Sequence, residues 1–253
     1  MYDLQGKTAI VTGAAAGLGA AVILKFAQEG VNVVACGNHR HDDTDALIAR
    51  CQAEGVTALF KETDVSREED INELFDTALK EMGDVDFIIN NAGIWLTSYV
   101  KDMDVADFRR TLDVNLIGPF LLSRRFVNYA LDRHKKGRIV NMTSQAAFHG
   151  STSGHAHYAS SKAGLVGFTI SLAREVAPYG INVNALAPGI METRMVSAIV
   201  DDPERREKYK ERIPLGYIST PEEIARVVMF LCSKEADYIT GATIDATGGM
   251  LMR

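Results

Sequence analysis

The amino-acid sequence predicts an α/β protein, with one domain over residues 1–253 built on a parallel sheet that has helices on both faces. Short apolar strands alternate along the chain with helical segments, and βαβ units produce this pattern. A glycine-rich turn joins the first strand to the first helix. No linker, low-complexity tract or internal repeat interrupts the sequence, so we expect a single domain.

The strands are expected at the apolar runs 9–11, 31–36, 58–62, 85–89, 139–142, 181–186 and 242–245. The helices are expected at 20–29, 44–54, 66–82, 104–133, 163–176, 196–212 and 221–233. Ser66 and Glu69 match the S-x-x-E capping box, and Pro119 predicts a kink or local break inside residues 104–133. The polar segment 196–212 is the least core-like stretch and the one expected to form a mobile flap.

The composition narrows the class of protein. A net charge of −6 argues against general nucleic-acid binding. The three cysteines are scattered, which fits reduced thiols in a cytoplasmic protein and gives neither a disulfide framework nor a metal-ligand spacing. The N-terminus has no signal-peptide pattern, and no apolar run approaches the ~18 residues that suggest a membrane span.

Tyr158 and Lys162 stand four residues apart at the start of a helical segment, so they share one helix face. A free tyrosine has a pKa near ~10 and transfers protons poorly at neutral pH. We expect the charge of Lys162 to lower the pKa of the Tyr158 phenol toward the working range. With the Ser144 hydroxyl, these side chains can polarise a carbonyl and move a proton. Alone, the short Y-x-x-x-K pattern would indicate an ordinary surface pair.

The sequence T-G-A-A-A-G-L-G, residues 12–19, lies between a strand and a helix. Small residues let backbone amides approach a pyrophosphate, and the helix N-terminus adds positive potential. This context favours a nucleotide site over a tight turn that needs glycine only for its positive φ. The residues expected to bind the nucleotide here are Gly13, Ala16, Gly17, Leu18 and Gly19.

Three later segments end strands, where open α/β sheets bind ligands. An aspartate after the third strand can accept a hydrogen bond from an adenine amino group, and the segment after the sixth strand can clamp a carboxamide. A plain turn explains each segment when it is taken alone. The residues concerned are Asp64, Val65, Asn91, Ala92, Gly93, Pro188, Gly189, Ile190 and Thr193.

Asn115 interrupts an apolar helical run, and a buried amide there must find hydrogen-bond partners. It is either a kink residue tied to a neighbouring carbonyl or the holder of a water relay. The spacing does not decide between these two interpretations.

Together, T-G-x-x-x-G-x-G, D-V, N-N-A-G, the helical Asn, the Ser, Y-x-x-x-K and P-G-x-x-x-T resemble the short-chain dehydrogenase/reductase family over essentially the whole chain. The resemblance implies a single-domain, Rossmann-like doubly wound parallel sheet of about seven strands that binds NAD or NADP. It implies a homotetramer and no metal. It makes Tyr158 the general acid or base, Lys162 the residue that lowers its pKa and holds the nicotinamide ribose, and Ser144 the group that polarises the carbonyl. Asn115 would hold the water that links Lys162 to solvent.

Within that family, K-A-G-L-V-G-F, S-L-A-R-E-V-A, E-T-R-M and A-D-Y-I-T-G-A-T resemble 3-oxoacyl-acyl-carrier-protein reductases. This resemblance implies an acyl-thioester substrate. It places the two basic contacts for an acidic carrier protein at Lys135 and Arg174. A basic patch on an acidic chain suits such a partner, and a solvated helix end explains it equally well.

Several departures favour a different small-molecule substrate. The spacing of fourteen from Ser144 to Tyr158 is longer than that subfamily leads us to expect, and the loop between them is rich in histidine. A sugar or polyol dehydrogenase is therefore the alternative. A catalytically idle nucleotide-binding or scaffold protein is a further possibility of a different class. The substrate contacts we expect are Trp95, Ser144, His149, His155, Met191 and Met195.

The second strand ends in G-N-H-R, with no acid to bind the ribose hydroxyls and repel a 2′-phosphate. This favours NADP over NAD, with Asn38 and His39 at the adenosine end of the site. Ala16 stands where many NADP-using relatives have a basic residue, and this weighs in the opposite direction.

Overall fold

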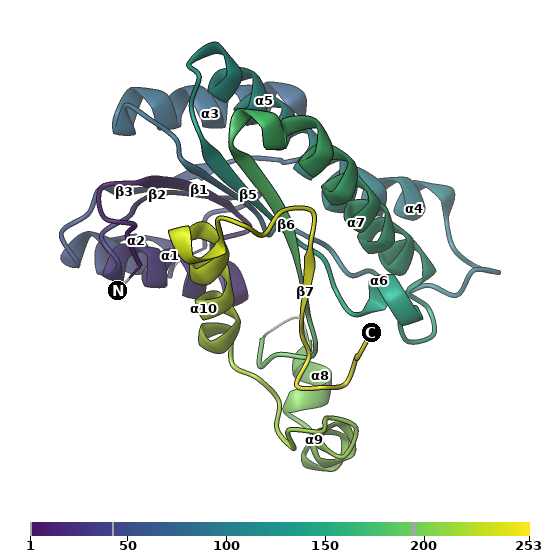
Figure 1. Cartoon of the computed structure of the whole chain (residues 1–253). Helices are drawn as coiled ribbons and strands as arrows, with labels where there is room; N and C mark the ends of the chain where they lie inside the picture. The colour runs from purple at the N-terminus through teal and green to yellow at the C-terminus, as the bar shows by residue number, and fades with distance from the viewer. Residues whose placement is uncertain (1, 42, 194–195) are drawn as a thin grey trace.

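A parallel sheet of seven strands crosses the protein in this computed structural model, which describes residues 2–41, 43–193 and 196–253 (Figure 1). The strands are β1 Thr8–Thr12, β2 Asn32–Gly37, β3 Ala58–Glu62, β4 Phe87–Asn90, β5 Gly137–Met142, β6 Ile181–Pro188 and β7 Thr243–Ala246. Their order across the sheet is β3-β2-β1-β4-β5-β6-β7. The chain changes direction across the sheet between β1 and β4, and such a switch point opens a crevice at the carboxyl ends of the strands.

The helices are α1 Gly17–Gln28, α2 Thr44–Ala53, α3 Glu68–Met82, α4 Val105–Leu112, α5 Gly118–Asp132, α6 Ala146–His149, α7 Ala156–Val176, α8 Ser197–Val200, α9 Pro203–Lys210 and α10 Pro221–Cys232. Helices α1, α2 and α10 cover one face of the sheet, and α3, α5 and α7 cover the other (Figure 1). In β1, Ala9 and Val11 pack in the first of these cores, and Ile10 packs in the second. The strands are therefore apolar on both faces, as buried parallel strands are.

The predicted helices and strands are present, but several begin or end at other residues than predicted. Helix α1 begins at Gly17 rather than residue 20, and α7 begins at Ala156, so Tyr158 and Lys162 both lie on it. The predicted helix 196–212 is divided into α8 and α9 by an Asp-Asp-Pro turn at 201–203. The short helix α6 was not predicted.

The capping box predicted at Ser66 and Glu69 is wrong. Helix α3 begins at Glu68, and Arg67 occupies its N-cap without a side-chain hydrogen bond. The Ser66 hydroxyl donates instead to Asp64 Oδ1, 2.6 Å away. Because the helix begins at Glu68, Ser66 stands one residue before the N-cap, and its hydroxyl serves the turn that precedes the helix.

The break predicted near Pro119 is confirmed. Helix α4 passes into a π-helical turn, Asp113–Ile117, and α5 then begins with Pro119 in its first turn. A proline has no N–H to donate, so the first turn of a helix tolerates it. The π-helical turn contains Asn115, and such turns re-aim side chains within a helix.

No helix in the described ranges has the length and hydropathy that crossing a bilayer requires. The three cysteines, Cys36, Cys51 and Cys232, are buried free thiols.

An ion-pair cluster lies where β4 begins and α5 ends. Lys135 Nζ lies 2.6 Å from a carboxylate oxygen of Asp84 and 2.7 Å from one of Asp86. Tyr129 donates to Asp84 over 2.5 Å, and the backbone N–H of Thr8 donates to Asp86 over 2.9 Å. Burial pushes the pKa of Asp84 upward, but the hydrogen bonds from Lys135 and Tyr129 outweigh it and leave that pKa below its ordinary value.

The expectation that Lys135 presents a basic contact to a carrier protein is therefore wrong. Its side chain is only 17% exposed and its charge is matched by two aspartates inside the fold. Arg138 is also largely covered and pairs with Asp237, whose side chain is exposed. Arg174 is exposed on α7, as a surface contact would be.

We predict that Lys135→Met destabilises the protein, because Asp84 loses its cation and the largely buried Asp86 keeps only the longer ion pair with Lys7, at 3.3 Å. The free energy of unfolding should fall by about 2 kcal/mol, measured by urea denaturation. The matched control is Lys136→Met, one residue further along the chain and exposed, which should change it by no more than about 0.5 kcal/mol. Equal effects of the two substitutions would show that the cluster does not stabilise the fold.

Candidate active site

The turn from β1 into α1 has no room for side chains at two of its glycines. Gly13 has a φ of +64°, and a Cβ there would lie 2.8 Å from the Cα of Ala92. A Cβ on Gly19 would lie 2.3 Å from the carbonyl oxygen of Gly13. These approaches leave the first amides of α1 at the carboxyl edge of the sheet, where a helix N-terminus attracts an anion.

Thr12 and Asn91 hold this turn against the end of β4. The Thr12 hydroxyl oxygen accepts hydrogen bonds from the backbone N–H groups of Asn91 and Ala92, at 3.0 and 2.9 Å. The Asn91 side chain donates to the carbonyl oxygens of Thr12 and Gly13, at 2.9 and 3.1 Å. The N-N-A-G segment is thus joined to the glycine-rich turn, although 79 residues separate Thr12 from Asn91.

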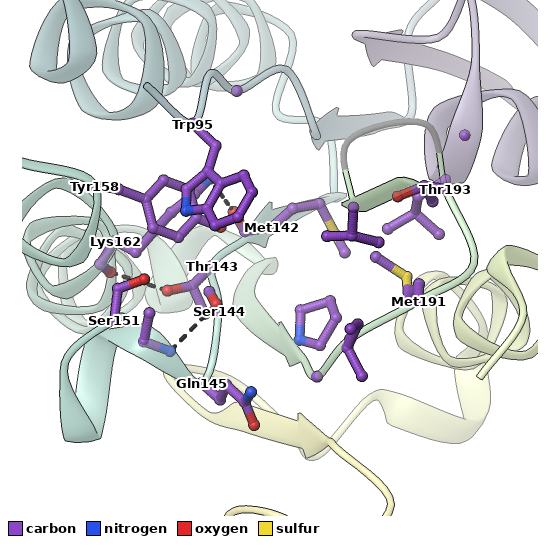
Figure 2. A pocket seen from close by; sticks show the side chains of 18 of the residues that line it. Trp95, Met142, Thr143, Ser144, Gln145, Ser151, Tyr158, Lys162, Met191 and Thr193 are labelled. Carbon is purple, nitrogen blue, oxygen red and sulfur yellow. Dashed lines mark hydrogen bonds between the residues drawn. The ribbon is translucent and has the colours of Figure 1, made fainter. Parts of the chain in front are cut away.

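A cavity of about 490 Å³ opens at this edge of the sheet (Figure 2). Trp95, Tyr158 and Lys162 lie on one side of it, and Met191 and Thr193 on the other (Figure 2). The predicted residues that line it are Gly13, Ala16, Gly17, Leu18, Asn91, Ala92, Gly93, Trp95, Ser144, His149, Tyr158, Lys162, Pro188, Gly189, Ile190, Met191 and Thr193.

Other predicted residues lie elsewhere. Asn38 and His39 follow β2, and Asp64 and Val65 follow β3, beside the cavity rather than in its wall. Gly19, Asn115 and His155 do not line the cavity. Met195 lies outside the described residues.

Lys162 is the buried cation of the site, with a residue exposure of 4%. Its Nζ donates to the carbonyl oxygen of Met142, the last residue of β5, over 2.8 Å. The Thr143 hydroxyl donates to the carbonyl oxygen of Lys162 over 2.9 Å, so α7 is tied to the end of β5 at two points. Burial lowers the pKa of Lys162 to about 8, which leaves most of the ammonium protonated at neutral pH.

Tyr158 has a pKa above its ordinary value in this arrangement. Removal from water raises the pKa, and a hydrogen bond with Ser144 lowers it by less. The expected lowering by Lys162 is not what this geometry shows, since Nζ is hydrogen-bonded to Met142 and lies 5.8 Å from the centre of the Tyr158 ring. The phenol therefore keeps its proton at neutral pH and can donate it to an oxygen in the cavity.

Asn115 sits behind the cavity wall with its amide fully engaged. Its Oδ1 accepts from the N–H of Ile94 over 2.8 Å, and its Nδ2 donates to the Ile94 carbonyl and the Ser161 hydroxyl, both over 3.0 Å. These bonds support the interpretation that it is tied to neighbouring backbone. A Cβ on Gly93 would lie 3.3 Å from Asn115 Oδ1 and 3.4 Å from Lys162 Nζ, so this glycine lets the two side chains meet behind it.

His155 supports the side of the cavity lined by Trp95. Its ring stacks on Trp95, with centroids 4.2 Å apart and planes 10° apart. Its two nitrogens lie 3.0 Å from the Thr97 hydroxyl and 3.1 Å from the Thr152 hydroxyl. His155 thus fixes Trp95 and the loop before α7, while His149 faces the cavity itself.

Several lining residues were not among the predicted site residues, and four of them matter below: Gln145, Tyr209, Arg212 and Met250. The position of Gln145 beside Ser144 was a signal that could have found it. The other three come from segments far along the chain that only the fold brings to the cavity. Within the described structure, Gln145 Oε1 is buried without a hydrogen-bond partner, and Nε2 has only the Met250 sulfur at 3.5 Å.

The residues present fit a nicotinamide dinucleotide. The glycine-rich turn and the start of α1 suit its pyrophosphate, and segment 188–193 lies across the cavity from Tyr158. At the adenosine end, Arg40 pairs with Asp45, and its guanidinium carbon lies 5.6 Å from the centre of the Phe60 ring. The backbone N–H of Arg40 donates to Glu62 over 3.1 Å.

Comparison with known proteins places these features in context. A family model described as enoyl-(acyl carrier protein) reductase matches residues 13–251. The chain is 40% identical to the 3-oxoacyl-[acyl-carrier-protein] reductase of Aquifex aeolicus, over 98% of each chain. It is 41% identical to 3beta-hydroxysteroid dehydrogenase 1 of Eggerthella lenta, over 100% of this chain and 97% of that one. A crystal structure from Agrobacterium tumefaciens, assigned as a 2-deoxy-d-gluconate 3-dehydrogenase with bound NADP, matches with a TM-score of 0.90 and 33% identity over 99% of this chain and 98% of that one.

We predict that Gly13→Ala weakens nucleotide binding by about a hundredfold, because the new methyl group would collide with the backbone of Ala92. The measurement is NADPH affinity by fluorescence titration. Gly55→Ala is the matched control: its φ of +85° carries the same backbone strain, but its Cβ meets no atom within 4 Å. A comparable loss of NADPH affinity in both variants would mean that the close approach at Gly13 is not required.

Proposed function

The chain belongs to the short-chain dehydrogenase/reductase family, and we propose that it interconverts a ketone and a secondary alcohol with a nicotinamide dinucleotide. One observation carries this proposal. The Tyr158 phenol, the Ser144 hydroxyl and the Lys162 ammonium share the wall of a cavity that the glycine-rich turn also lines. This set argues for turnover rather than for an idle nucleotide-binding scaffold, because proton-transfer groups have no role in a scaffold.

When bound, the nicotinamide would supply or accept the hydride at the reacting carbon. In the reductive direction, Tyr158 donates its phenolic proton to the carbonyl oxygen, and in the oxidative direction it takes the alcohol proton. The Ser144 hydroxyl oxygen accepts from the N–H of Ala146 over 3.2 Å, and its proton, directed to the Tyr158 oxygen in this structure, would turn to the substrate oxygen when substrate binds. The ammonium of Lys162, held by the Met142 carbonyl, places a fixed positive charge beside Tyr158 at this end of the cavity.

Different segments of the chain would bind different parts of the nucleotide. The turn and α1 would hold the pyrophosphate, the ends of β2 and β3 the adenosine, and the ends of β4 and β6 the nicotinamide half. The residues concerned are Gly13, Ala16, Gly17, Leu18 and Gly19, then Asn38, His39, Asp64 and Val65, then Asn91, Ala92, Gly93, Pro188, Gly189, Ile190 and Thr193.

We propose NADP as the preferred nucleotide. The residues that follow β2 include no carboxylate until Asp42, and Glu62 at the end of β3 is occupied by the backbone N–H of Arg40. The bound NADP of the Agrobacterium structure supports this choice.

For the substrate, we propose a small, oxygen-rich molecule of the sugar or polyol class. Buried polar groups in proteins are hydrogen-bonded, so an amide without proper partners beside an active site is available to a ligand. The Gln145 amide meets this description. Ser151 and Thr152 in the lengthened loop add hydroxyls to the cavity lining.

A 3-oxoacyl thioester is the second candidate, favoured by the 40% identity to the Aquifex reductase. An acidic carrier protein as partner would have to use Arg174, since Lys135 is held inside the fold. A thioester without the carrier is therefore the form to test.

We also propose a cytoplasmic homotetramer of single-domain chains. Ile117, Phe120 and Ile170 are 40%, 37% and 39% exposed on the outer side of the π-helical turn, α5 and α7. Large apolar side chains exposed on these elements favour contact with another chain. Light scattering after gel filtration measures the assembly.

We predict that Tyr158→Phe lowers kcat/KM by about a thousandfold, because it removes the proton donor and keeps the ring. NADPH affinity should stay within about threefold of the wild type, which separates chemistry from binding. Substantial turnover in this variant would refute the proposed mechanism.

The proposed substrate class is tested with acetoacetyl-CoA against a set of sugars and polyols, each with both nucleotides. We expect the best sugar or polyol to exceed acetoacetyl-CoA in kcat/KM by about tenfold or more, and NADP(H) to exceed NAD(H). A faster reaction with acetoacetyl-CoA would assign the thioester function instead. A preference for NAD(H) would contradict the nucleotide assignment.

A further inference from the structure

We infer that Arg212 is a specificity residue that binds a carboxylate on the substrate, so that the enzyme acts on a hydroxy or oxo acid. This inference rests on the proposed function and names a narrower substrate class for the same cavity. Three observations support it. Arg212 lines the cavity, its guanidinium has no hydrogen-bond or ion-pair partner within the described ranges, and the described lining residues include cations but no Asp or Glu.

The basic residues of α9 all have carboxylate partners. The pairs are Arg205 with Asp202 at 3.4 Å, Arg206 with Glu192, Lys208 with Glu204 at 2.7 Å, and Lys210 with Glu207 at 2.6 Å. Arg212, two residues beyond the helix, differs from these four. Its backbone N–H bonds to the Tyr209 carbonyl, but within the described ranges its guanidinium forms no hydrogen bond or ion pair.

Tyr209 orients this unpaired group. The guanidinium carbon of Arg212 lies 5.0 Å from the centre of the Tyr209 ring, and both residues line the cavity. Stacking on an aromatic face restricts the arginine without using its five N–H donors. The donors therefore remain available as a planar fork, the geometry that binds a carboxylate through two parallel hydrogen bonds.

The charged side chains of the cavity wall are positive. Among the described lining residues there is no Asp or Glu, whereas Lys162 and Arg212 both carry positive charge. Lys162 is committed to the Met142 carbonyl near the reacting centre. Arg212 is then the lining cation left to neutralise an anionic group, and a carboxylate gains more from it than a neutral hydroxyl does.

A phosphate of the nucleotide is the other anion that could reach this cavity. The pyrophosphate already has the amides of the glycine-rich turn and the positive end of α1, which belong to a different part of the chain. A substrate carboxylate has no comparable set of donors among the other described lining residues. The Gln145 amide, in the same wall, suits a hydroxyl of the same molecule. The resemblance to a protein assigned as a gluconate-type dehydrogenase agrees with a hydroxy acid.

The fluorescence of Trp95 provides a binding assay that needs no turnover, because it is the single tryptophan of the chain and lines the cavity. The probes are matched acid and neutral pairs with NADPH present: gluconate with sorbitol, and 3-hydroxybutanoate with 2-butanol. The variants are Arg212→Gln and Arg212→Lys. Lys208→Gln is the control, since it removes a paired cation of α9 that does not line the cavity.

In at least one pair, we expect the wild type to bind the acid about tenfold more tightly than the neutral partner, a modest ratio because Arg212 is solvent-exposed. Arg212→Gln should abolish this preference, Arg212→Lys should retain part of it, and Lys208→Gln should leave it intact. No preference for any acid in the wild type, or a preference that survives Arg212→Gln, would overturn the inference.

A loss of NADPH affinity in Arg212→Gln as large as the loss of acid affinity would also overturn it, because Arg212 would then serve the nucleotide. A separate experiment tests the proposed function: substantial turnover in Tyr158→Phe would refute it, whatever the Arg212 variants show. The fluorescence preference for acids would stand unchanged in that case.

Discussion

One buried ammonium group sets the geometry on which the chemistry depends. Lys162 is almost enclosed by protein, and its charge is held there by the carbonyl dipole of Met142 at the end of β5. Burial disfavours the charge and brings its pKa to about 8, but the hydrogen bond keeps the group in one place. Because Tyr158 stands one turn earlier on the same helix face, fixing Lys162 also fixes the phenol over the cavity.

A network of buried polar side chains supports this geometry from within the sheet. Asn90 Nδ2 donates to Asn141 Oδ1 over 2.7 Å and to the Ser123 hydroxyl over 3.1 Å. Asn141 Nδ2 in turn donates to the Thr169 hydroxyl over 2.9 Å. The network joins β4, β5, α5 and α7 just before the strands reach the site. Satisfied networks of this kind are rigid and specify a single arrangement, because any slip would leave a buried polar group unpaired.

The two halves of the cavity are built by different means. The half proposed to bind the nucleotide consists of backbone groups, glycines and strand ends, which many sequences can provide in the same form. The half proposed to bind the substrate consists of side chains from loops and from the segment after α9, among them Trp95, Gln145 and Arg212. Substrate choice can therefore change without disturbing the hydride-transfer machinery. Relatives named for acyl-carrier-protein, hydroxysteroid and 2-deoxy-d-gluconate substrates each match nearly the whole chain.

The sequence by itself determined the α/β class, the order of the elements, the glycine-rich turn and the pairing of Tyr158 with Lys162, because periodicity and local spacing encode all of these. Only the tertiary structure decided the rest. Ser66 hydrogen-bonds to Asp64 rather than capping α3. Lys135 forms ion pairs with Asp84 and Asp86, which lie just before β4. The pKa of Tyr158 is set by burial rather than by Lys162. Arg212 reaches the cavity from 50 residues beyond Lys162. Each of these outcomes depends on which distant groups share one small volume, and no pattern of neighbouring residues records that.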